Sequence, residues 1–240
     1  MLVSASPPLL ALAERLAARF PLERQEHEAL LDLPAAIARM PANGQIVAAD
    51  EAVEHAYVVL DGLVGQARQT RRGEQQITAL YLPGETACLE AILAGGSATP
   101  LTALAPSALL VIPVDALRRA ERRHPELARA FWRECQYQAR ISAEWLLNIG
   151  RRRATARTAH LFCELAWRSQ GQDHSPRTRF PLPARQSHLA DVLALTTVHL
   201  NRTLRVLREE GLASFRAREL HIHDWRRLAA LADFDPSYLS

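Results

Sequence analysis

The chain has 240 residues, 48% of them hydrophobic, and a formal net charge of +3, with a mean hydropathy of −0.11. These values are typical of a globular protein with one large domain or two modest ones. No apolar run approaches the roughly 18 residues of a membrane-spanning helix, and Glu14 and Arg15 interrupt the N-terminal apolar segment, which argues against a signal peptide. We expect a cytoplasmic protein with no membrane contact.

The charge is divided unevenly along the chain. Residues 1–150 carry 14 arginines against 17 acidic residues, a net charge of −3, and residues 151–240 carry 15 against 9, a net charge of +6. A basic C-terminal part attracts phosphate groups, so this division favours nucleic acid as a partner.

The three cysteines, Cys88, Cys135 and Cys163, lie far apart and form no CxxC pair. This spacing does not support a disulfide framework, a zinc ribbon or a thioredoxin-type site. We expect reduced thiols, no bound metal and no cofactor.

Residues 9–40 are predicted to form short helices, because apolar positions recur at steps of three and four. From residue 43 to about 114 the pattern changes to short β-like runs, at 45–49, 56–60, 63–69, 76–82 and 108–114. Turn signals separate them, at Asn43–Gly44, Asp61–Gly62, 71–74, 83–85 and Gly95–Gly96. Many short strands at such spacing predict a compact antiparallel roll or barrel.

A long helix is predicted over residues 125–149. One stripe of this helix recurs at three- and four-residue steps and consists of Leu127, Phe131, Cys135 (or its neighbour Glu134), Gln138, Ile141, Trp145 and Asn148. The stripe is predicted to be a seam that pairs two copies of the chain. Packing of the same stripe against its own domain is the open alternative.

A further helix follows Gly150 and is predicted to end at Gly171, before a proline-rich loop or short hairpin. Residues 186–194 are then predicted to form a short helix that buries Leu189, Val192 and Leu193. Leu195 follows as a turn residue, and the hydroxyl of Thr196 is placed to cap the next helix. We expect this next helix to bury Leu200, Thr203, Leu204 and Leu207.

The opposite face of that second helix carries Thr197, Val198, Asn201, Arg202 and Arg205. Arginine bonds bidentately to guanine, asparagine to adenine, and a valine or threonine methyl group fits against thymine. Two helices joined by a short turn, with such a face on the second, predict a DNA-binding helix-turn-helix. The alternative is an ordinary solvated face of an amphipathic helix.

Two short strands, 212–216 and 219–223, are predicted to form a hairpin with its turn at Ala217–Arg218. A hairpin after the recognition helix indicates a winged helix, from which Arg216 and Arg218 would reach phosphates. His221 and His223 alternate onto one strand face, but without a third ligand nearby a metal site is not favoured.

Over residues 20–240 the chain resembles the Crp/Fnr family of bacterial transcription regulators. The segments that carry the resemblance are "HAYVVLDGLV" (55–64), "YLPGE" (81–85), "IGRRRATARTAHLFCEL" (149–165), "LADVLALTTVHLNRTLRVLREEGL" (189–212) and "DWRRLAALADFDPSYL" (224–239). The resemblance implies a β-roll sensor, a long dimerisation helix and a winged helix-turn-helix.

The resemblance also implies roles for single residues. Arg202 matches the base-contacting arginine of the family, and Arg185 and Ser187 match phosphate-contacting positions. Val198 replaces a glutamate that many members carry, which implies a different base preference. Ala194 stands where a glycine is usual, and a left-handed backbone there would cost about 1 kcal/mol. The complete predicted DNA-binding set is Arg185, Ser187, Thr196, Thr197, Val198, His199, Asn201, Arg202, Arg205, Arg216 and Arg218.

The sensor departs from its cyclic nucleotide-binding relatives. Their β-roll holds the cyclic phosphate with an arginine, because a buried phosphate without a cation is very costly. In this chain no arginine or lysine occurs between Arg72 and Arg118, which argues against cyclic AMP binding in the usual mode. No cysteine precedes Cys88, which argues against an iron–sulfur cluster. For haem, His27, His55 and Cys88 are the candidate ligands, but structural roles for them are favoured.

The resulting prediction is an α+β homodimeric transcription regulator. Residues 1–124 would form the antiparallel, jelly-roll-like sensor with flanking short helices, 125–150 the dimerisation helix and 151–240 the winged helix-turn-helix. The expected partners are palindromic double-stranded DNA, a second copy of the chain and RNA polymerase. For the sensor, an unknown small-molecule effector, a redox response at Cys88 or Cys135 and no effector at all stay open. The chain contains no HExxH, P-loop or GxSxG motif, so no enzyme is expected. The alternative is a signalling module that responds to a cyclic nucleotide, haem or redox change.

Overall fold

The computed structural model describes residues 7–49, 52–89, 99–169 and 176–239. It divides into two compact units, one of residues 1–66 and 81–138 (the N-terminal unit) and one of residues 67–80 and 139–240 (the C-terminal unit). The predicted turn at Gly95–Gly96 and the predicted helix end at Gly171 lie outside the described residues. Among those residues, no helix combines the length and apolar character needed to cross a membrane.

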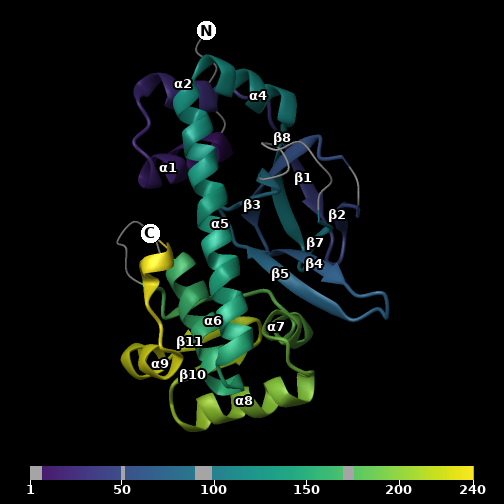
Figure 1. Cartoon of the computed structure of the whole chain (residues 1–240), viewed down its shortest axis with the longest axis vertical. Helices are drawn as coiled ribbons and strands as arrows, with labels where there is room; N and C mark the ends of the chain where they lie inside the picture. Colours follow the sequence, from purple (N-terminus) through teal and green to yellow (C-terminus); the bar gives the residue numbers. More distant parts are fainter. Residues whose placement is uncertain (1–6, 50–51, 90–98, 170–175, 240) are drawn as a thin grey trace. The chain divides into compact units, whose positions relative to one another are not determined.

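The helices are labelled in Figure 1. Their bounds are α1 (Pro7–Arg19), α2 (Arg24–Leu31), α4 (Val114–Arg123), α5 (Pro125–Arg151), α6 (Ala154–Arg168), α7 (Gln186–Leu193), α8 (Thr197–Glu209), α9 (Trp225–Ala232) and the 3-10 helix η1 (Pro236–Leu239). The strands are β1 (Ala36–Met40), β2 (Gln45–Val47), β3 (His55–Asp61), β4 (Val64–Gln69), β5 (Gln75–Tyr81), β6 (Thr86–Ala87), β7 (Leu101–Ala103), β8 (Ser107–Pro113), β9 (Arg179–Pro181), β10 (Ala213–Arg216) and β11 (Glu219–Ile222).

Two four-stranded sheets form the predicted antiparallel roll. Their strand orders are β1-β8-β3-β6 and β2-β7-β4-β5. Within the first sheet β3 pairs with β8 from His55 opposite Pro113 to Asp61 opposite Ala108. The turn signal at Asp61–Gly62 has a steric reason, because Gly62 has a φ of +93° and a Cβ there would lie 2.3 Å from Ser107 Oγ. The α+β fold class is confirmed.

Residues 36–40 were predicted as helical, and this prediction was wrong. They form β1, which pairs with β8 from Ala36 opposite Val111 to Met40 opposite Ser107. Ala, Arg and Met favour helices locally, but the unpaired edge of β8 supplies backbone hydrogen bonds that outweigh this preference.

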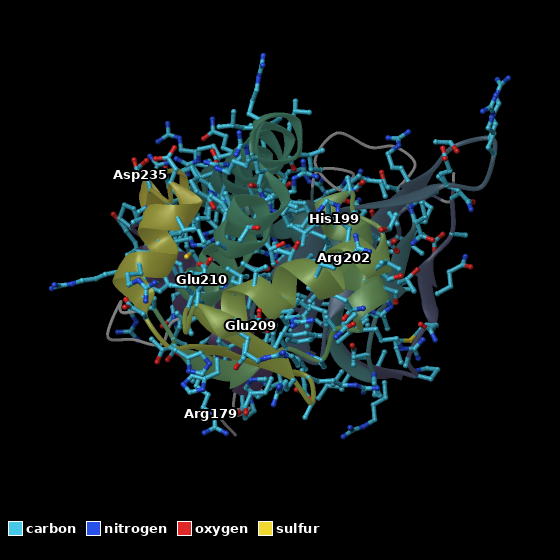
Figure 2. All side chains as sticks on the ribbon, turned by 90° about the horizontal axis from the view of Figure 1, so that it is seen from below. Arg179, His199, Arg202, Glu209, Glu210 and Asp235 are labelled. Atoms are coloured by element: carbon cyan, nitrogen blue, oxygen red, sulfur yellow. The ribbon has the colours of Figure 1, made fainter. Side chains whose placement is uncertain are left out.

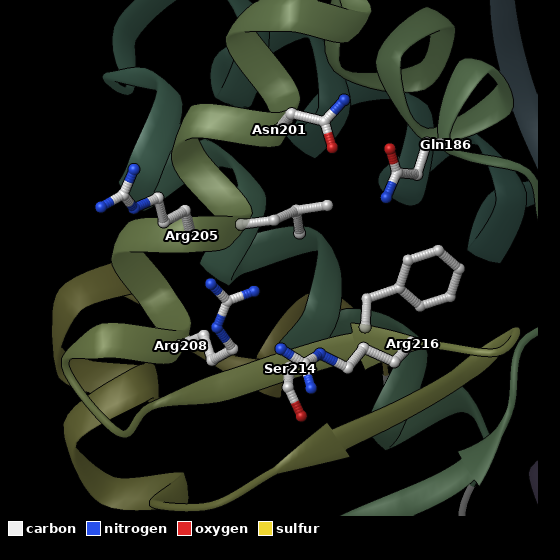
Figure 3. Close-up of a pocket in the computed structure, with 8 residues that line it drawn as sticks. Gln186, Asn201, Arg205, Arg208, Ser214 and Arg216 are labelled. Carbon is white, nitrogen blue, oxygen red and sulfur yellow. The ribbon is translucent and has the colours of Figure 1, made fainter.

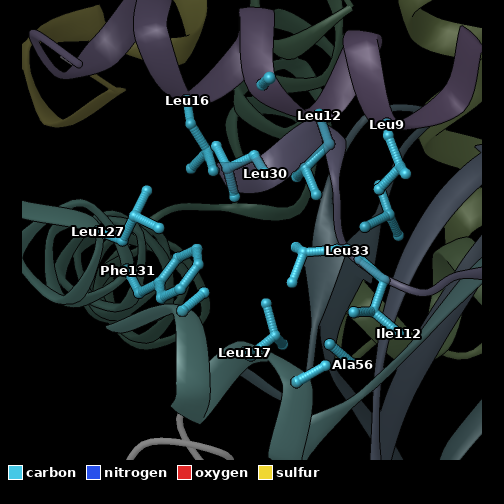
Figure 4. Packing of buried hydrophobic residues seen from close by; sticks show 14 of the residues in the cluster. Leu9, Leu12, Leu16, Leu30, Leu33, Ala56, Ile112, Leu117, Leu127 and Phe131 are labelled. Atoms are coloured by element: carbon cyan, nitrogen blue, oxygen red, sulfur yellow. The ribbon is translucent and has the colours of Figure 1, made fainter. Parts of the chain in front are cut away.

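The N-terminal core lies where α1 and α2 cover the first sheet. Figure 4 shows Leu9, Leu12 and Leu16 of α1 directed toward strand residues and toward Leu127 and Phe131 of α5. The step of three and four between the α1 leucines places all of them on one face of the helix, which explains why the periodicity predicted this helix correctly.

Two arginines of α1 also compensate buried carboxylates in this unit. Arg15 lies 3.3 Å from Glu85, whose carboxylate accepts the Leu82 N–H at 2.9 Å. Arg19 donates to Glu134 on α5 at 2.8 Å, and its guanidinium lies over the Tyr137 ring at 3.7 Å. The turn at residues 83–85 is therefore held by the ion pair between Glu85 and Arg15, which lies 70 residues earlier in the chain.

The stripe of α5 that was predicted to pair two chains packs within this one. Leu127 and Phe131 belong to the N-terminal core, and Ile141, Trp145 and Asn148 are buried in the C-terminal unit. Asn148 donates to the Arg157 carbonyl at 3.2 Å, while Cys135 and Gln138 are half-buried. Packing against the same chain, the alternative left open by the sequence, accounts for the buried members of the stripe. Dimerisation itself stays a prediction.

A buried carboxylate, Glu164, connects three segments of the C-terminal unit. It pairs with Arg168 at 2.8 Å, and both side chains are fully buried. The Trp145 indole N–H donates to both Glu164 oxygens at 3.0 Å, and the Tyr238 hydroxyl donates at 2.9 Å. The end of α5, the middle of α6 and the C-terminal residues are thus held by one carboxylate.

Removing this carboxylate is expected to destabilise the C-terminal unit strongly. Glu164→Ala removes the carboxylate that pairs with the buried Arg168, and breaking a buried ion pair in this way costs roughly 3–5 kcal/mol. Urea unfolding followed by tryptophan fluorescence would measure the loss, since Trp145, Trp167 and Trp225 lie in this unit. Glu209→Ala, which removes the exposed Arg205–Glu209 pair, is the control and should cost less than about 1 kcal/mol. Equal small effects of the two variants would contradict the assignment.

His160 gives the C-terminal unit a pH-dependent stability. Burial, with a contribution from Arg152, lowers the pKa of His160 to about 3. Below its ordinary pKa the unfolded chain binds a proton that the folded chain does not, so stability present above about pH 6.5 is lost as the pH falls toward 3. We predict that His160→Phe loses less stability than the wild type between these values in urea unfolding. The exposed His199→Phe should keep the wild-type profile, and an unchanged slope in His160→Phe would refute the prediction.

Candidate nucleic-acid interface

Both helices of the helix-turn-helix are capped at their N-termini by local hydrogen bonds. At α7 the Arg185 backbone N–H donates to His188 Nδ1 at 3.2 Å. At α8 the Thr196 hydroxyl accepts the His199 N–H at 3.1 Å, the N-cap that the sequence predicted. Between the two helices Ala194 has φ 50° and ψ 45°. The backbone is therefore left-handed at the position where the resemblance implied a glycine.

Burial separates two faces of α8. Leu200, Thr203, Leu204 and Leu207 are buried, as predicted. The opposite face is exposed, and Val198 alone exposes 61% of its surface. His199 and Arg202 lie toward the start of α8, and Glu209 and Glu210 lie at its end (Figure 2). All eleven predicted DNA-binding residues are exposed, namely Arg185, Ser187, Thr196, Thr197, Val198, His199, Asn201, Arg202, Arg205, Arg216 and Arg218.

Two members of this set have partners within α8. Asn201 donates to the Thr197 carbonyl at 3.0 Å, and Arg205 Nε donates to Glu209 at 2.7 Å. Among the described residues no other bond is found for either side chain, so their remaining polar atoms are available for contact with DNA.

The predicted wing is present and has a third strand. The sheet order is β10-β11-β9, where β9 lies in the segment predicted as a loop or short hairpin. Ala217 and Arg218 both have positive φ, of 49° and 61°. This is typical of a two-residue hairpin turn whose twist matches that of its strands. The turn exposes Arg216 and Arg218 together at the end of the wing.

The histidines of the wing contact each other and a serine. The rings of His221 and His223 lie 4.1 Å apart, and His223 Nε2 lies 2.9 Å from Ser214 Oγ. Within the described part of the chain, which includes His27, His55 and Cys88, no cluster of three or more His, Cys, Asp or Glu side chains could hold a metal ion. Burial raises the pKa of Cys163 to about 12, so this thiol stays protonated at neutral pH.

Three further residues join this surface that the sequence did not single out. Gln186, Arg208 and Ser214 line a pocket together with Asn201, Arg205 and Arg216. Arg208 follows Arg205 by three residues and so lies on the same side of α8. The sequence alone therefore shows that Arg205 and Arg208 share one side of the helix. Only the packing of the wing against α8 shows that this side forms a pocket.

Comparison with known proteins assigns both parts of the chain. A family described as the Crp-like helix-turn-helix domain matches residues 156–231, and one described as the cyclic nucleotide-binding domain matches residues 38–124. The nitrogen fixation regulation protein FixK of Azorhizobium caulinodans is 32% identical over 78% of this chain and 73% of its own length. The chain belongs to the Crp/Fnr family. It is a transcription regulator with a helix-turn-helix DNA-binding domain.

Other members of the Crp/Fnr family agree with this assignment. The fumarate and nitrate reduction regulatory protein of Escherichia coli is 24% identical over 77% of this chain and 73% of its own. The structure of FixK2 from Bradyrhizobium japonicum superposes with a TM-score of 0.75 at 26% identity, over 83% of this chain and 98% of that one.

The left-handed turn provides a direct test of the local geometry. Ala194→Gly should stabilise the C-terminal unit by about 1 kcal/mol, because glycine adopts the left-handed backbone without the Cβ clash. Ala230→Gly in the interior of α9 is the matched control and should destabilise by roughly 0.5–1 kcal/mol. Urea unfolding would measure both, and destabilisation by Ala194→Gly would show that the turn is not left-handed in solution.

Proposed function

We propose that the chain is a homodimeric regulator that binds a palindromic operator through α8. In this proposal residues 1–124 are the sensor, 125–150 the dimerisation helix and 151–240 the DNA-binding domain. The observation that carries it is the two-sided character of α8: a buried leucine face fixes the helix, and the exposed face presents hydrogen-bonding and methyl groups for the major groove.

Each residue of the exposed α8 face has a role that fits its chemistry. Arg202 would bond bidentately to a guanine, Asn201 to an adenine, and Val198 would contact a thymine methyl group. Thr197 and His199 flank these residues at the start of the helix, and Arg205 follows one turn later. Because Val198 has no charge, the base preference would differ from that of members with glutamate there.

The remaining residues of the predicted set would contact phosphates. Arg185 and Ser187 lie at the start of α7, and Arg216 and Arg218 lie on the wing, so they flank α8 on two sides. The Thr196 hydroxyl accepts the His199 N–H and keeps its own hydrogen for a phosphate oxygen. Such contacts fix the orientation of a protein on DNA without selecting the sequence.

A second, exposed stripe of α5 is the better candidate for pairing two chains. Positions 132, 136, 139, 143, 146 and 150 alternate steps of four and three residues, the spacing of a coiled-coil seam. Trp132 and Leu146 on this stripe expose 59% and 74% of their surfaces. Ala139, Ala143 and Gly150 would allow two helices to approach closely. Two copies paired here would present two α8 helices to a two-fold symmetric site.

The sensor is proposed to act without a cyclic nucleotide bound in the usual mode, since no cation stands between Arg72 and Arg118. An effector of other chemistry would act by shifting the population of DNA-binding and non-binding poses of the dimer. The proposal has no enzymatic step. It places the protein in the bacterial cytoplasm, where DNA and RNA polymerase are its partners.

Arg202 provides the sharpest test of DNA recognition. We predict that Arg202→Ala loses about 1–3 kcal/mol of binding energy for a duplex selected from random DNA, and tolerates changes at one base pair per half-site. Arg218→Ala should weaken binding to all sequences evenly. Fluorescence anisotropy with each single base-pair variant separates the two patterns, and an unchanged preference in Arg202→Ala would disprove the assignment of α8.

The dimer proposal is tested by a charge on the exposed stripe of α5. Leu146→Glu should convert the protein to a species of 26.7 kDa in sedimentation equilibrium, because two carboxylates would be buried opposite each other. Leu231→Glu, on the exposed side of α9, is the control and should stay dimeric. A Leu146→Glu protein that remains dimeric would mean that another surface pairs the chains.

A further inference from the structure

A small basic pocket lies between α8, the wing and the start of α7. It has a volume of about 180 Å³. Figure 3 shows Arg208 from α8, Gln186 from α7, and Ser214 and Arg216 from β10 around it, while the end of the Arg205 side chain is directed away from them. Three separate elements therefore supply polar groups to one cavity.

The positive charge in this pocket is only partly compensated. Three arginines, Arg205, Arg208 and Arg216, line it, and none of the lining residues is acidic. Arg205 is bonded to Glu209, whereas no ion pair is found for Arg208 or Arg216 in the described residues. Like charges placed side by side destabilise the folded chain, so the arrangement favours an anion between them.

The neutral groups of the pocket add hydrogen bonds to this charge. Gln186 and Asn201 carry amide N–H donors, and Ser214 carries a hydroxyl. Leu204 and Phe215 also line the pocket and are buried, whereas the arginines are exposed and accessible to a ligand from solution. Several donors around a tetrahedral oxyanion are the arrangement by which proteins bind phosphate, with arginine bonding two oxygens at once.

We propose that this pocket binds one backbone phosphate of the operator, held by Arg208 together with Arg216. The inference rests on the proposed function and adds Arg208, Gln186 and Ser214 to the DNA-binding surface. Asn201 and Arg205 belong both to the base-contacting face of α8 and to the pocket, so a duplex against that face brings its backbone to the pocket. The cavity is smaller than the roughly 300–1,000 Å³ of ordinary small-molecule sites, which fits a single phosphate group.

The first experiment measures the salt dependence of operator binding. Arg208→Gln keeps hydrogen-bonding capacity but removes the charge. It should lower the slope of log Kd against log salt concentration by about 2 for a dimer on its operator, about 1 for each half-site, with base preference unchanged. Arg226→Gln, exposed on α9 and outside the pocket, is the matched control and should keep the wild-type slope. Equal slopes in Arg208→Gln and the wild type would overturn the proposal.

The second experiment locates the phosphate and excludes a free anion as the ligand. Methylphosphonate groups, which are uncharged, replace the operator phosphates one at a time. The proposal requires one position per half-site where this replacement weakens the wild type clearly more than it weakens Arg208→Gln, in which only Arg216 still contacts the phosphate. If inorganic phosphate binds the DNA-free protein through Arg208 and no methylphosphonate position behaves this way, the ligand is a free anion and the proposal fails. Base discrimination through Arg202 would survive that failure, whereas loss of discrimination as well would refute the proposed function.

Discussion

The buried carboxylate of Glu164 is the interaction on which the C-terminal unit depends. It accepts hydrogen bonds from Trp145 on α5, Arg168 on α6 and Tyr238 near the C-terminus, so segments far apart in the chain share one charged group. A carboxylate is tolerated in such a place only when it is paired and hydrogen-bonded. Helix α6 packs against α7, α8 and α9. The hydrogen bonds that hold α6 through Glu164 therefore also stabilise the helix-turn-helix and the orientation of the exposed face of α8.

Local sequence signals predicted the DNA-binding unit well, because its elements begin and end through short-range chemistry. The Thr196 cap bonds a residue three positions later, and the α8 leucines share a face by helical periodicity alone. The wing turn needs only the two adjacent residues Ala217 and Arg218, so its position could be predicted from the short strands on either side. The left-handed conformation of Ala194 was anticipated only from the resemblance, which places a glycine at this position.

Features that depend on distant partners were missed. Strand β1 forms because its backbone pairs with β8, some 70 residues later in the chain. The residues of β1 alone carry no pattern that indicates this pairing. The stripe of α5 was identified as regular, but periodicity does not say whether the same chain or a second copy covers it. Arg208 was passed over because its spacing indicates only a basic residue near a helix end, where it favours the helix dipole. The wing packed beside α8 turns it into part of a basic pocket.

The central claim is that two α8 helices, related by two-fold symmetry, recognise DNA sequence. Selection of bound sequences from random duplex DNA by the purified, full-length protein tests it most directly. The account predicts an inverted repeat whose half-site centres lie about 10–10.5 base pairs apart, or a multiple of that spacing. Enrichment of no motif, with only weak binding that disappears as salt is raised, would contradict it.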